Sequence, residues 1–223
     1  MAVLTVNHLS KNFRDKSLLD YIALECRTGE ILSIFGRNGS GKSTLLKILF
    51  GTVKADSIRL FINDTPVDIA NVIPQKLIAY LPQISSLPKS MVVRDIVTMY
   101  FDDEEIQDRL LYNPLITRVA SNKAGTLSMG ELRYFELLLI CHLPHPFLLL
   151  DEPFSMIEPL YRDCIREFLH EIKVTKGIII TDHYYNDVFL TADRNLLLHN
   201  GRLVVVNSKE DLVGYGYIPA SNL

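Results

Sequence analysis

The sequence predicts an α/β fold with a mostly parallel sheet, an N-terminal antiparallel β subdomain and an inserted α-helical subdomain. Short apolar runs of strand length alternate with helical patterns, as they do in βαβ units. Alternating apolar residues open the chain, and a long helical stretch at about residues 85–143 interrupts the later alternation. The 223 residues are 48% hydrophobic and 22% charged, which suits a folded domain rather than a disordered chain.

The first half of the chain begins with antiparallel strands within residues 3–25, separated by weak turn signals at residues 12–16. An apolar run that ends on a glycine then indicates a buried strand, and a helix pattern closed by Gly51 follows it. The elements predicted after the opening strands are strands at residues 31–35, 57–63 and 77–81 and a helix at residues 43–50.

The second half continues the alternation after the helical stretch. Phe147–Leu150 and Ile178–Ile180 have the length and flanks of buried strands, and Pro159 opens an amphipathic helix between them. Asn200-Gly201 suits a two-residue type I′ turn, so NLLLHNGRLVVV predicts a β-hairpin. A short helix at residues 208–213 ends the series.

Charge and hydropathy limit the classes of protein. The net charge of −3 argues against a nucleic-acid binder that relies on bulk positive charge. The longest apolar run without a charge or proline, Leu137–Leu143, is far short of the roughly 20 residues that span a membrane. The N-terminus also lacks the layout of a secretion signal. We therefore expect a soluble, intracellular chain.

The sharpest motif is GRNGSGKS at residues 36–43, which fits the P-loop pattern G-x-x-x-x-G-K-[ST]. A strand pattern precedes it and a helix pattern follows, and this context disfavours an accidental glycine-rich turn. Backbone N–H groups and the helix N-terminus would cradle phosphate oxygens. Lys42 would reach the β- and γ-phosphates of ATP, and the Ser43 hydroxyl would bind Mg²⁺. The expected nucleotide-binding residues here are Gly36, Asn38, Gly39, Ser40, Gly41, Lys42, Ser43 and Thr44.

Two carboxylates follow the predicted strand at residues 147–150. Because ligands bind at the carboxyl ends of strands in open α/β sheets, Asp151 and Glu152 would lie near the P-loop. Asp151 would hold Mg²⁺, and Glu152 could polarise the attacking water. Such a pair alone could be a solvated strand end, but its place after a P-loop favours the catalytic interpretation.

Between these motifs lies LSMGE at residues 127–131, followed by an apolar helix pattern. Together with GRNGSGKST and LLLDEP, it resembles the nucleotide-binding (ATPase) subunit of an ABC transporter, whose signature motif is LSGGQ or LSGGE. The resemblance covers essentially the whole chain. It implies a P-loop NTPase core, a single ATPase domain over residues 1–223 and a helical subdomain at about residues 85–143.

The resemblance also implies roles for residues outside the P-loop. Phe13 lies where the family places an aromatic ring that stacks on adenine, and a core phenylalanine is the alternative. Gln83, in YLPQ, matches the glutamine that contacts Mg²⁺ and the region of the attacking water. His183, in ITDH, matches the switch histidine that contacts the γ-phosphate, and a structural histidine is the alternative. The implied catalytic residues are Glu152, His183, Gln83 and Lys42, and the implied metal ligands are Ser43, Gln83 and Asp151.

The signature motif implies a second chain. Ser128 and Gly130 would lie at a helix N-terminus, where N–H groups and the helix dipole favour an anion. In the family this helix points at the γ-phosphate that the other subunit binds. One chain has one P-loop and one signature, so a complete site requires a two-fold pair around two ATP molecules. The implied partners are a second copy of the ATPase subunit and separate transmembrane permease subunits, with no nucleic acid.

Two positions depart from the family pattern. Met129 replaces a glycine of the signature, so it either tolerates the local conformation or weakens the contact with the other subunit. Glu158, in SMIE, stands where the family usually has the aspartate of SALD and has a side chain longer by one methylene. We expect hydrolysis to survive, because Lys42, Asp151, Glu152 and His183 are all present.

The sequence thus predicts an ATP-hydrolysing subunit, peripheral on the cytoplasmic face of a membrane, that drives separate permease subunits. One alternative is a soluble ABC ATPase that remodels a ribosome, DNA or a protein complex. Another is a nucleotide-gated binding module that barely hydrolyses ATP, which the departures at Met129 and Glu158 suggest. The transported substrate and the direction of transport depend mainly on the membrane subunits.

Overall fold

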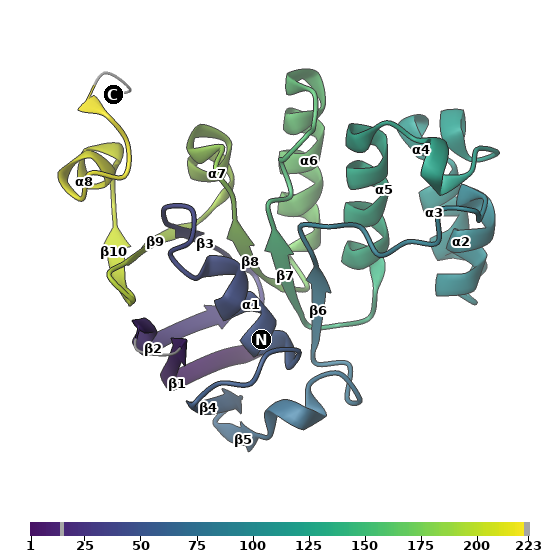
Figure 1. Cartoon of the computed structure of the whole chain (residues 1–223). Coiled ribbons are helices and arrows are strands. Elements are labelled where there is room, and N and C mark those ends of the chain that lie inside the picture. The colour runs from purple at the N-terminus through teal and green to yellow at the C-terminus, as the bar shows by residue number, and fades with distance from the viewer. Residues whose placement is uncertain (14–15, 221–223) are drawn as a thin grey trace.

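A six-stranded sheet with the order β10-β9-β3-β8-β7-β6 forms the centre of the molecule (Figure 1). The computed structural model describes residues 1–13 and 16–220. Neighbouring strands from β9 to β6 pair in parallel, and β10 pairs with β9 in antiparallel fashion. The predicted parallel sheet is therefore confirmed. Its strands are β3 (Ile31–Phe35), β6 (Ile78–Leu81), β7 (Phe147–Asp151), β8 (Gly177–Thr181), β9 (Arg194–His199) and β10 (Arg202–Val206).

A second, antiparallel sheet with the order β2-β1-β4-β5 is built mainly from the N-terminal segment, as predicted. Its strands are β1 (Val3–Phe13), β2 (Lys16–Arg27), β4 (Ser57–Ile62) and β5 (Thr65–Val67). The turn signals at residues 12–16 include residues 14–15, which lie outside the described residues. The sequence patterns did not indicate β5, because it has three residues and contains a proline, as edge strands often do.

The central sheet is buried on its two faces, which explains why its strands are continuous apolar runs rather than alternating ones. Leu32 and Ile34 of β3 pack in a core shared with the antiparallel sheet and with helix α1 (Lys42–Phe50). Ile31 and Phe35, which alternate with them, pack in the other core against helices. Side chains buried this fully contribute about 1.5–3 kcal/mol each, so the two cores hold the strand ends in place.

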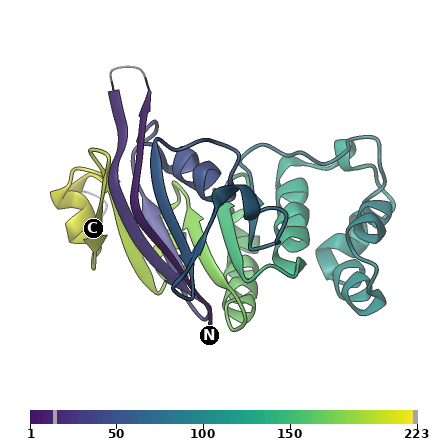
Figure 2. The same ribbon diagram turned by 90° about the horizontal axis from the view of Figure 1, so that it is seen from below.

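The helical stretch begins later than predicted. The pattern suggested helix from about residue 85, but the first helix starts at Val93, and residues 82–92 form a connection that contains Pro82 and Pro88. Proline disfavours helical conformation in the residue before it, which explains the delay. The helices of this stretch are α2 (Val93–Tyr100), α3 (Glu104–Leu111), α4 (Pro114–Val119) and α5 (Met129–His142). Figure 2 shows α2–α4 gathered at the opposite side of the molecule from the antiparallel sheet.

Among the described residues, the remaining helices are α6 (Pro159–Ile172), α7 (Tyr185–Thr191) and α8 (Lys209–Gly214), and short 3₁₀ helices lie at Ile69–Asn71 and Ala124–Thr126. Asn200 and Gly201 have positive φ angles between β9 and β10, which confirms the predicted hairpin turn. Across the described part of the chain, no helix combines the length and the apolarity that crossing a membrane demands.

Candidate active site

The predicted P-loop joins β3 to α1 and leaves the N-terminus of that helix open. Gly41 is the N-cap residue with φ 111°, and a Cβ atom there would lie 3.0 Å from the Leu18 side chain and 3.1 Å from that of Leu19. Within residues 1–13 and 16–220 no side chain caps α1, and the first turn of this helix contains no acidic residue. The first N–H groups of a helix lack partners within the helix, so this end suits phosphate oxygens.

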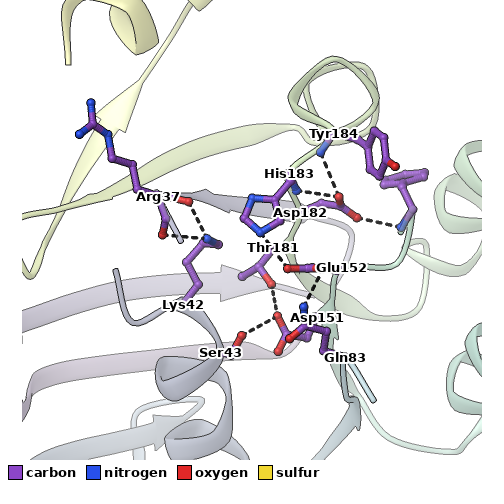
Figure 3. Close-up of polar contacts among 12 residues, drawn as sticks. Arg37, Lys42, Ser43, Gln83, Asp151, Glu152, Thr181, Asp182, His183 and Tyr184 are labelled. Carbon is purple, nitrogen blue, oxygen red and sulfur yellow. Dashed lines mark hydrogen bonds and ion pairs between the residues drawn. The ribbon is translucent and has the colours of Figure 1, made fainter. Parts of the chain in front are cut away.

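Lys42, the first residue of α1, lies under the loop and is 6% exposed. Its ammonium group donates hydrogen bonds to the carbonyl oxygens of Gly36 at 2.5 Å and Arg37 at 3.3 Å (Figure 3). Burial lowers the pKa of Lys42, and the nearby charges of Glu152 and Asp151 oppose this shift. The positively charged Lys42 ammonium therefore lies at the loop to which the sequence motif assigns phosphate binding.

A cleft of about 400 Å³ brings the predicted motifs together. The P-loop forms one side, and Gln83, Glu152 and His183 approach from the ends of β6, β7 and β8. The strand order β8-β7-β6 makes these three residues neighbours although they are far apart in sequence. The lining residues are Leu18, Asn38, Gly39, Ser40, Gly41, Lys42, Ser43, Thr44, Gln83, Glu152 and His183.

Asp151 is the centre of a buried hydrogen-bond network at the edge of this cleft (Figure 3). The hydroxyls of Ser43 and Thr181 donate to Oδ1 at 3.1 and 2.6 Å. The Tyr80 hydroxyl donates to Oδ2 at 3.1 Å, and burial, followed by the Asp151 charge, raises the pKa of Tyr80. Sequence reasoning missed Thr181 and Tyr80, although polar side chains on strands next to β7 were a usable signal.

The same network tests whether the residues fit a magnesium ion. Mg²⁺ prefers oxygen ligands and is usually bound by one or two carboxylates together with substrate phosphates. The Ser43 hydroxyl and the Asp151 carboxylate offer such oxygens, already in contact at 3.1 Å next to the open end of α1. These residues fit the ion.

Glu152 lies between Gln83 and His183 (Figure 3). The Gln83 amide donates to Oε2 of Glu152 at 3.0 Å, and Nε2 of His183 lies 2.9 Å from Oε1. Glu152 has φ 58°, a left-handed conformation that glutamate rarely adopts, and its N–H donates to the Thr181 carbonyl at 2.6 Å. The backbone is thus held so that the carboxylate stands between an amide and an imidazole.

Asp182 fixes the segment that carries His183. Its carboxylate accepts the backbone N–H groups of Phe154, His183 and Tyr184 at 2.8, 2.7 and 3.0 Å. Burial raises the pKa of Asp182 to about 6, although these three hydrogen bonds oppose the shift. The residue is in the quoted ITDH motif, but sequence reasoning assigned it no role.

Phe13 does not join the other predicted site residues. Its side chain is 52% exposed at the end of β1, so the alternative of a core phenylalanine is excluded. The Lys11 ammonium lies 5.0 Å from the centre of its ring, and Phe13 does not line the P-loop cleft.

Ser128 and Gly130 lie at the N-terminus of α5, away from the P-loop cleft. The Ser128 hydroxyl accepts the Glu131 N–H at 3.2 Å, and the Glu131 carboxylate accepts the Ser128 N–H at 2.8 Å. This pair forms a capping box. Met129 is the first helical residue and has no positive φ, so methionine tolerates the local conformation.

A second cavity of about 340 Å³ adjoins this helix end, and it shares no lining residue with the P-loop cleft. Ser128, Gly130 and Glu158 line it, together with Met129 and Met156. A Cβ atom on Gly130 would lie 2.8 Å from the Met156 carbonyl oxygen, so a glycine is needed for this close approach. The molecule therefore presents its P-loop and its signature motif in two separate places.

Known proteins share this sequence and this fold. The sequence profile of a family described as ABC transporter matches residues 19–155, more than half of the chain. The lipopolysaccharide export system ATP-binding protein LptB of Acidithiobacillus ferridurans is 26% identical over 95% of this chain and 92% of its own length. LptB of Escherichia coli K12 is 27% identical over 96% of this chain and 93% of its length. A solved structure of an ATP binding subunit of an ABC transporter has a TM-score of 0.83 at 23% identity, covering 98% of this chain and 95% of that one.

Proposed function

The chain belongs to the ABC transporter family, and we propose from this premise that two copies of it close around two ATP molecules to drive separate membrane-spanning subunits. The protein is an ATP-binding subunit that hydrolyses ATP and powers transport. The finer assignments are ours: the residues that act on ATP, the identity of the second subunit as another copy, and the use of Mg²⁺.

One observation carries this proposal. Glu152 stands within hydrogen-bonding distance of Gln83 and His183 at the edge of a cleft whose other side is the P-loop. A carboxylate placed next to a phosphate-binding loop can accept the proton of an attacking water. The signature motif lines a different cavity, which supports the idea that it serves the ATP of a second chain.

The mechanism follows from the positions of these side chains. The backbone N–H groups at the start of α1 and the Lys42 ammonium bind the phosphates. Ser43 and Asp151 would hold Mg²⁺, with Gln83 as a further ligand, and the ion when bound offsets negative charge on the β- and γ-phosphate oxygens. Glu152 accepts a proton from the water that attacks the γ-phosphate, while the bond from the γ-phosphorus to the bridging oxygen breaks and ADP leaves with that oxygen. His183 orients Glu152 and contacts the γ-phosphate, and this orientation keeps the carboxylate ready to act.

The proposed assembly uses the remaining parts of the chain. Two copies pair with two-fold symmetry, so that Ser128 and Gly130 of one face the P-loop of the other. Residues 85–143 form the helical subdomain that contacts the membrane subunits, and the exposed Phe13 ring stacks on adenine. The complex lies on the cytoplasmic face of the membrane and involves no nucleic acid. Hydrolysis persists with Met129 and Glu158 in place, because Met129 tolerates the local conformation at the start of α5.

A mixing experiment tests the shared site. Lys42→Ala disables the P-loop, and Ser128→Arg blocks the signature, so each variant alone is expected to lose ATP hydrolysis. In a mixed dimer one of the two sites combines an intact P-loop with an intact signature. Random pairing should therefore restore roughly a quarter of the parent activity, because half of the dimers are mixed. Recovery of no activity from two variants that remain folded would show that the sites do not form in this way.

Affinity purification from detergent-solubilised membranes of the source organism tests the transport role. We expect the tagged chain to retain a membrane-spanning protein in a stable complex, identified by mass spectrometry. Recovery of ribosomal or DNA-bound proteins alone would instead favour a soluble ABC ATPase that remodels such complexes.

A further inference from the structure

Arg133 is a buried arginine on α5 that contacts two of the catalytic segments. It is the fifth residue of the helix that begins at the signature, and it is 6% exposed. Nη1 donates to the carbonyl oxygen of Pro82 at 2.6 Å, directly before Gln83. Nη2 donates to the carbonyl oxygen of Asp151 and to that of Glu152, the latter at 3.1 Å. One side chain thus holds the backbone beside Gln83 and beside Glu152.

Glu136, almost one turn further along α5, extends this contact to the other side of Gln83. Its carboxylate lies 3.8 Å from Nη1 of Arg133, and its side chain is almost fully buried. Burial raises the pKa of Glu136, and the nearby Ser85, Arg133 and Ser86 oppose that shift. Arg133 therefore binds the backbone directly before Gln83, and Glu136 lies beside residues 85 and 86 that follow it. Both side chains come from the signature helix.

Packing alone does not explain this pair. Removing two charges from water is costly, and well-packed apolar residues of similar volume often give equal or greater stability. Burial lowers the pKa of Arg133, and four carboxylates, first Glu136, oppose that shift. The guanidinium directs its fixed fork of N–H groups at backbone carbonyls that flank catalytic side chains, which an apolar residue could not do.

We propose that Arg133, supported by Glu136, is a positioning residue that holds Gln83 and Glu152 in their 3.0 Å contact and ties that contact to the signature helix. This inference rests on the proposed function, because it assumes that Glu152 acts on the attacking water. A shift of α5 on pairing with a second copy then moves Gln83 and Glu152 through one side chain. ATP engaged by the signature of one copy would in this way adjust the carboxylate in that copy's own P-loop cleft.

The test is Arg133→Lys, which keeps the positive charge and loses the planar fork. We expect kcat for ATP hydrolysis to fall by roughly 10- to 100-fold, because small misplacements of catalytic groups have effects of this size. The Kd for ATP, measured with a fluorescent nucleotide, should stay at the parent value. Added to Glu152→Gln, the substitution should cause no further loss in single-turnover hydrolysis, because it acts through that carboxylate.

The control is Arg27→Lys, which alters an exposed ion pair with Glu25 on β2 and should leave kcat unchanged. A normal kcat in Arg133→Lys, or an equal loss with and without Glu152, would overturn the inference. If Glu152→Gln itself hydrolyses ATP at the parent rate, the proposed function fails instead, so the two failures are distinguishable.

Glu136→Gln keeps the test informative if Arg133→Lys does not fold. It retains the size of the side chain and removes its charge, so it weakens the grip on Arg133 while leaving the packing of α5 nearly intact. We expect a smaller loss of kcat in the same direction, again with an unchanged Kd for ATP. Glu136→Gln with parent kcat would contradict the proposal.

Discussion

Two helices of this protein begin at motifs assigned to phosphate, and their N-termini are built in opposite ways. Helix α1 begins after Gly41, with no side-chain cap and no acidic residue in its first turn. Helix α5 begins after Ser128, with a capping box that includes Glu131. The first leaves N–H groups for a ligand, whereas the second satisfies part of its own N–H groups from within the chain.

The difference teaches what each end can do alone. The open end of α1 adjoins Lys42, Ser43 and the Glu152 carboxylate, so one chain by itself contains the phosphate-binding half of the proposed site. The capped end of α5 has its hydroxyl engaged and an acidic residue in its first turn, which weakens its attraction for an anion. It is therefore suited to complete a site that another chain has already formed, rather than to form one.

The same substitution at the two ends should have very different effects. Glu152→Gln, beside the open end, should lower kcat by about 10²- to 10⁴-fold, because a positioned base is lost. Glu131→Gln, at the capped end, should lower it by less than about tenfold, because glutamine also serves in a capping box. Steady-state ATP hydrolysis at saturating ATP measures both, and equal losses would remove the distinction between the two ends.

Backbone N–H groups near the P-loop cleft are satisfied in a third way, by the single carboxylate of Asp182, which accepts three of them. Its pKa of about 6 lies above the unfolded value near 3.8, so between these pH values the folded state binds more protons. The stability contributed by this group therefore falls as pH rises from about 4 to 6.

Asp182→Asn removes this titration. The free energy of unfolding, from urea denaturation at a series of pH values, should depend on pH differently in the variant, by on the order of 1 kcal/mol per pH unit between about pH 4 and 6. Parallel curves for parent and variant across that window would show that the pKa of Asp182 is not raised.

Gly130→Ala changes the packing at the capped N-terminus of α5 without replacing the residues of its capping box. The added Cβ atom would lie 2.8 Å from the Met156 carbonyl oxygen and push α5 away from the loop before α6. We expect ATP-dependent association of two copies to weaken about tenfold, which equals about 1.4 kcal/mol, measured by analytical ultracentrifugation in the Glu152→Gln background. Gly214→Ala is the matched control, because nothing lies within 4 Å of a Cβ atom there. Similar weakening in the control would contradict the proposed role of the close approach.

Ser128→Ala should have the smallest effect of the variants considered. It should lower the stability of the chain slightly and also weaken the ATP-dependent association of two copies. Loss of an N-cap serine costs about 1 kcal/mol, which thermal unfolding detects. Ser208→Ala is the matched control, because Ser208 is the N-cap of α8 and also forms a capping box. Both variants should lose similar stability, and only Ser128→Ala should weaken ATP-dependent association. If they behave alike in association, the α5 terminus has a capping role alone.

Much of the fold was readable from local patterns, and the exceptions have local causes. The apolar runs of β3, β7 and β8 and the Asn200-Gly201 turn predicted the elements that the structure contains. The delayed start of α2 follows from Pro88, a signal that the helical periodicity concealed. Helix α7 was not indicated, because its seven residues are too few to establish a period.

The sequence by itself predicted the phosphate-binding segment, because the P-loop motif is a continuous segment whose glycines and lysine act through local backbone geometry. It also determined the order of the motifs and the family. Only the tertiary structure decided that Glu152 stands between Gln83 and His183, and that Tyr80 and Thr181 hold Asp151. These contacts depend on the order and register of buried strands, and a continuous apolar run specifies burial without specifying its neighbours. The role of Arg133 could not be predicted for a similar reason, because its partners are backbone carbonyls that no sequence pattern distinguishes.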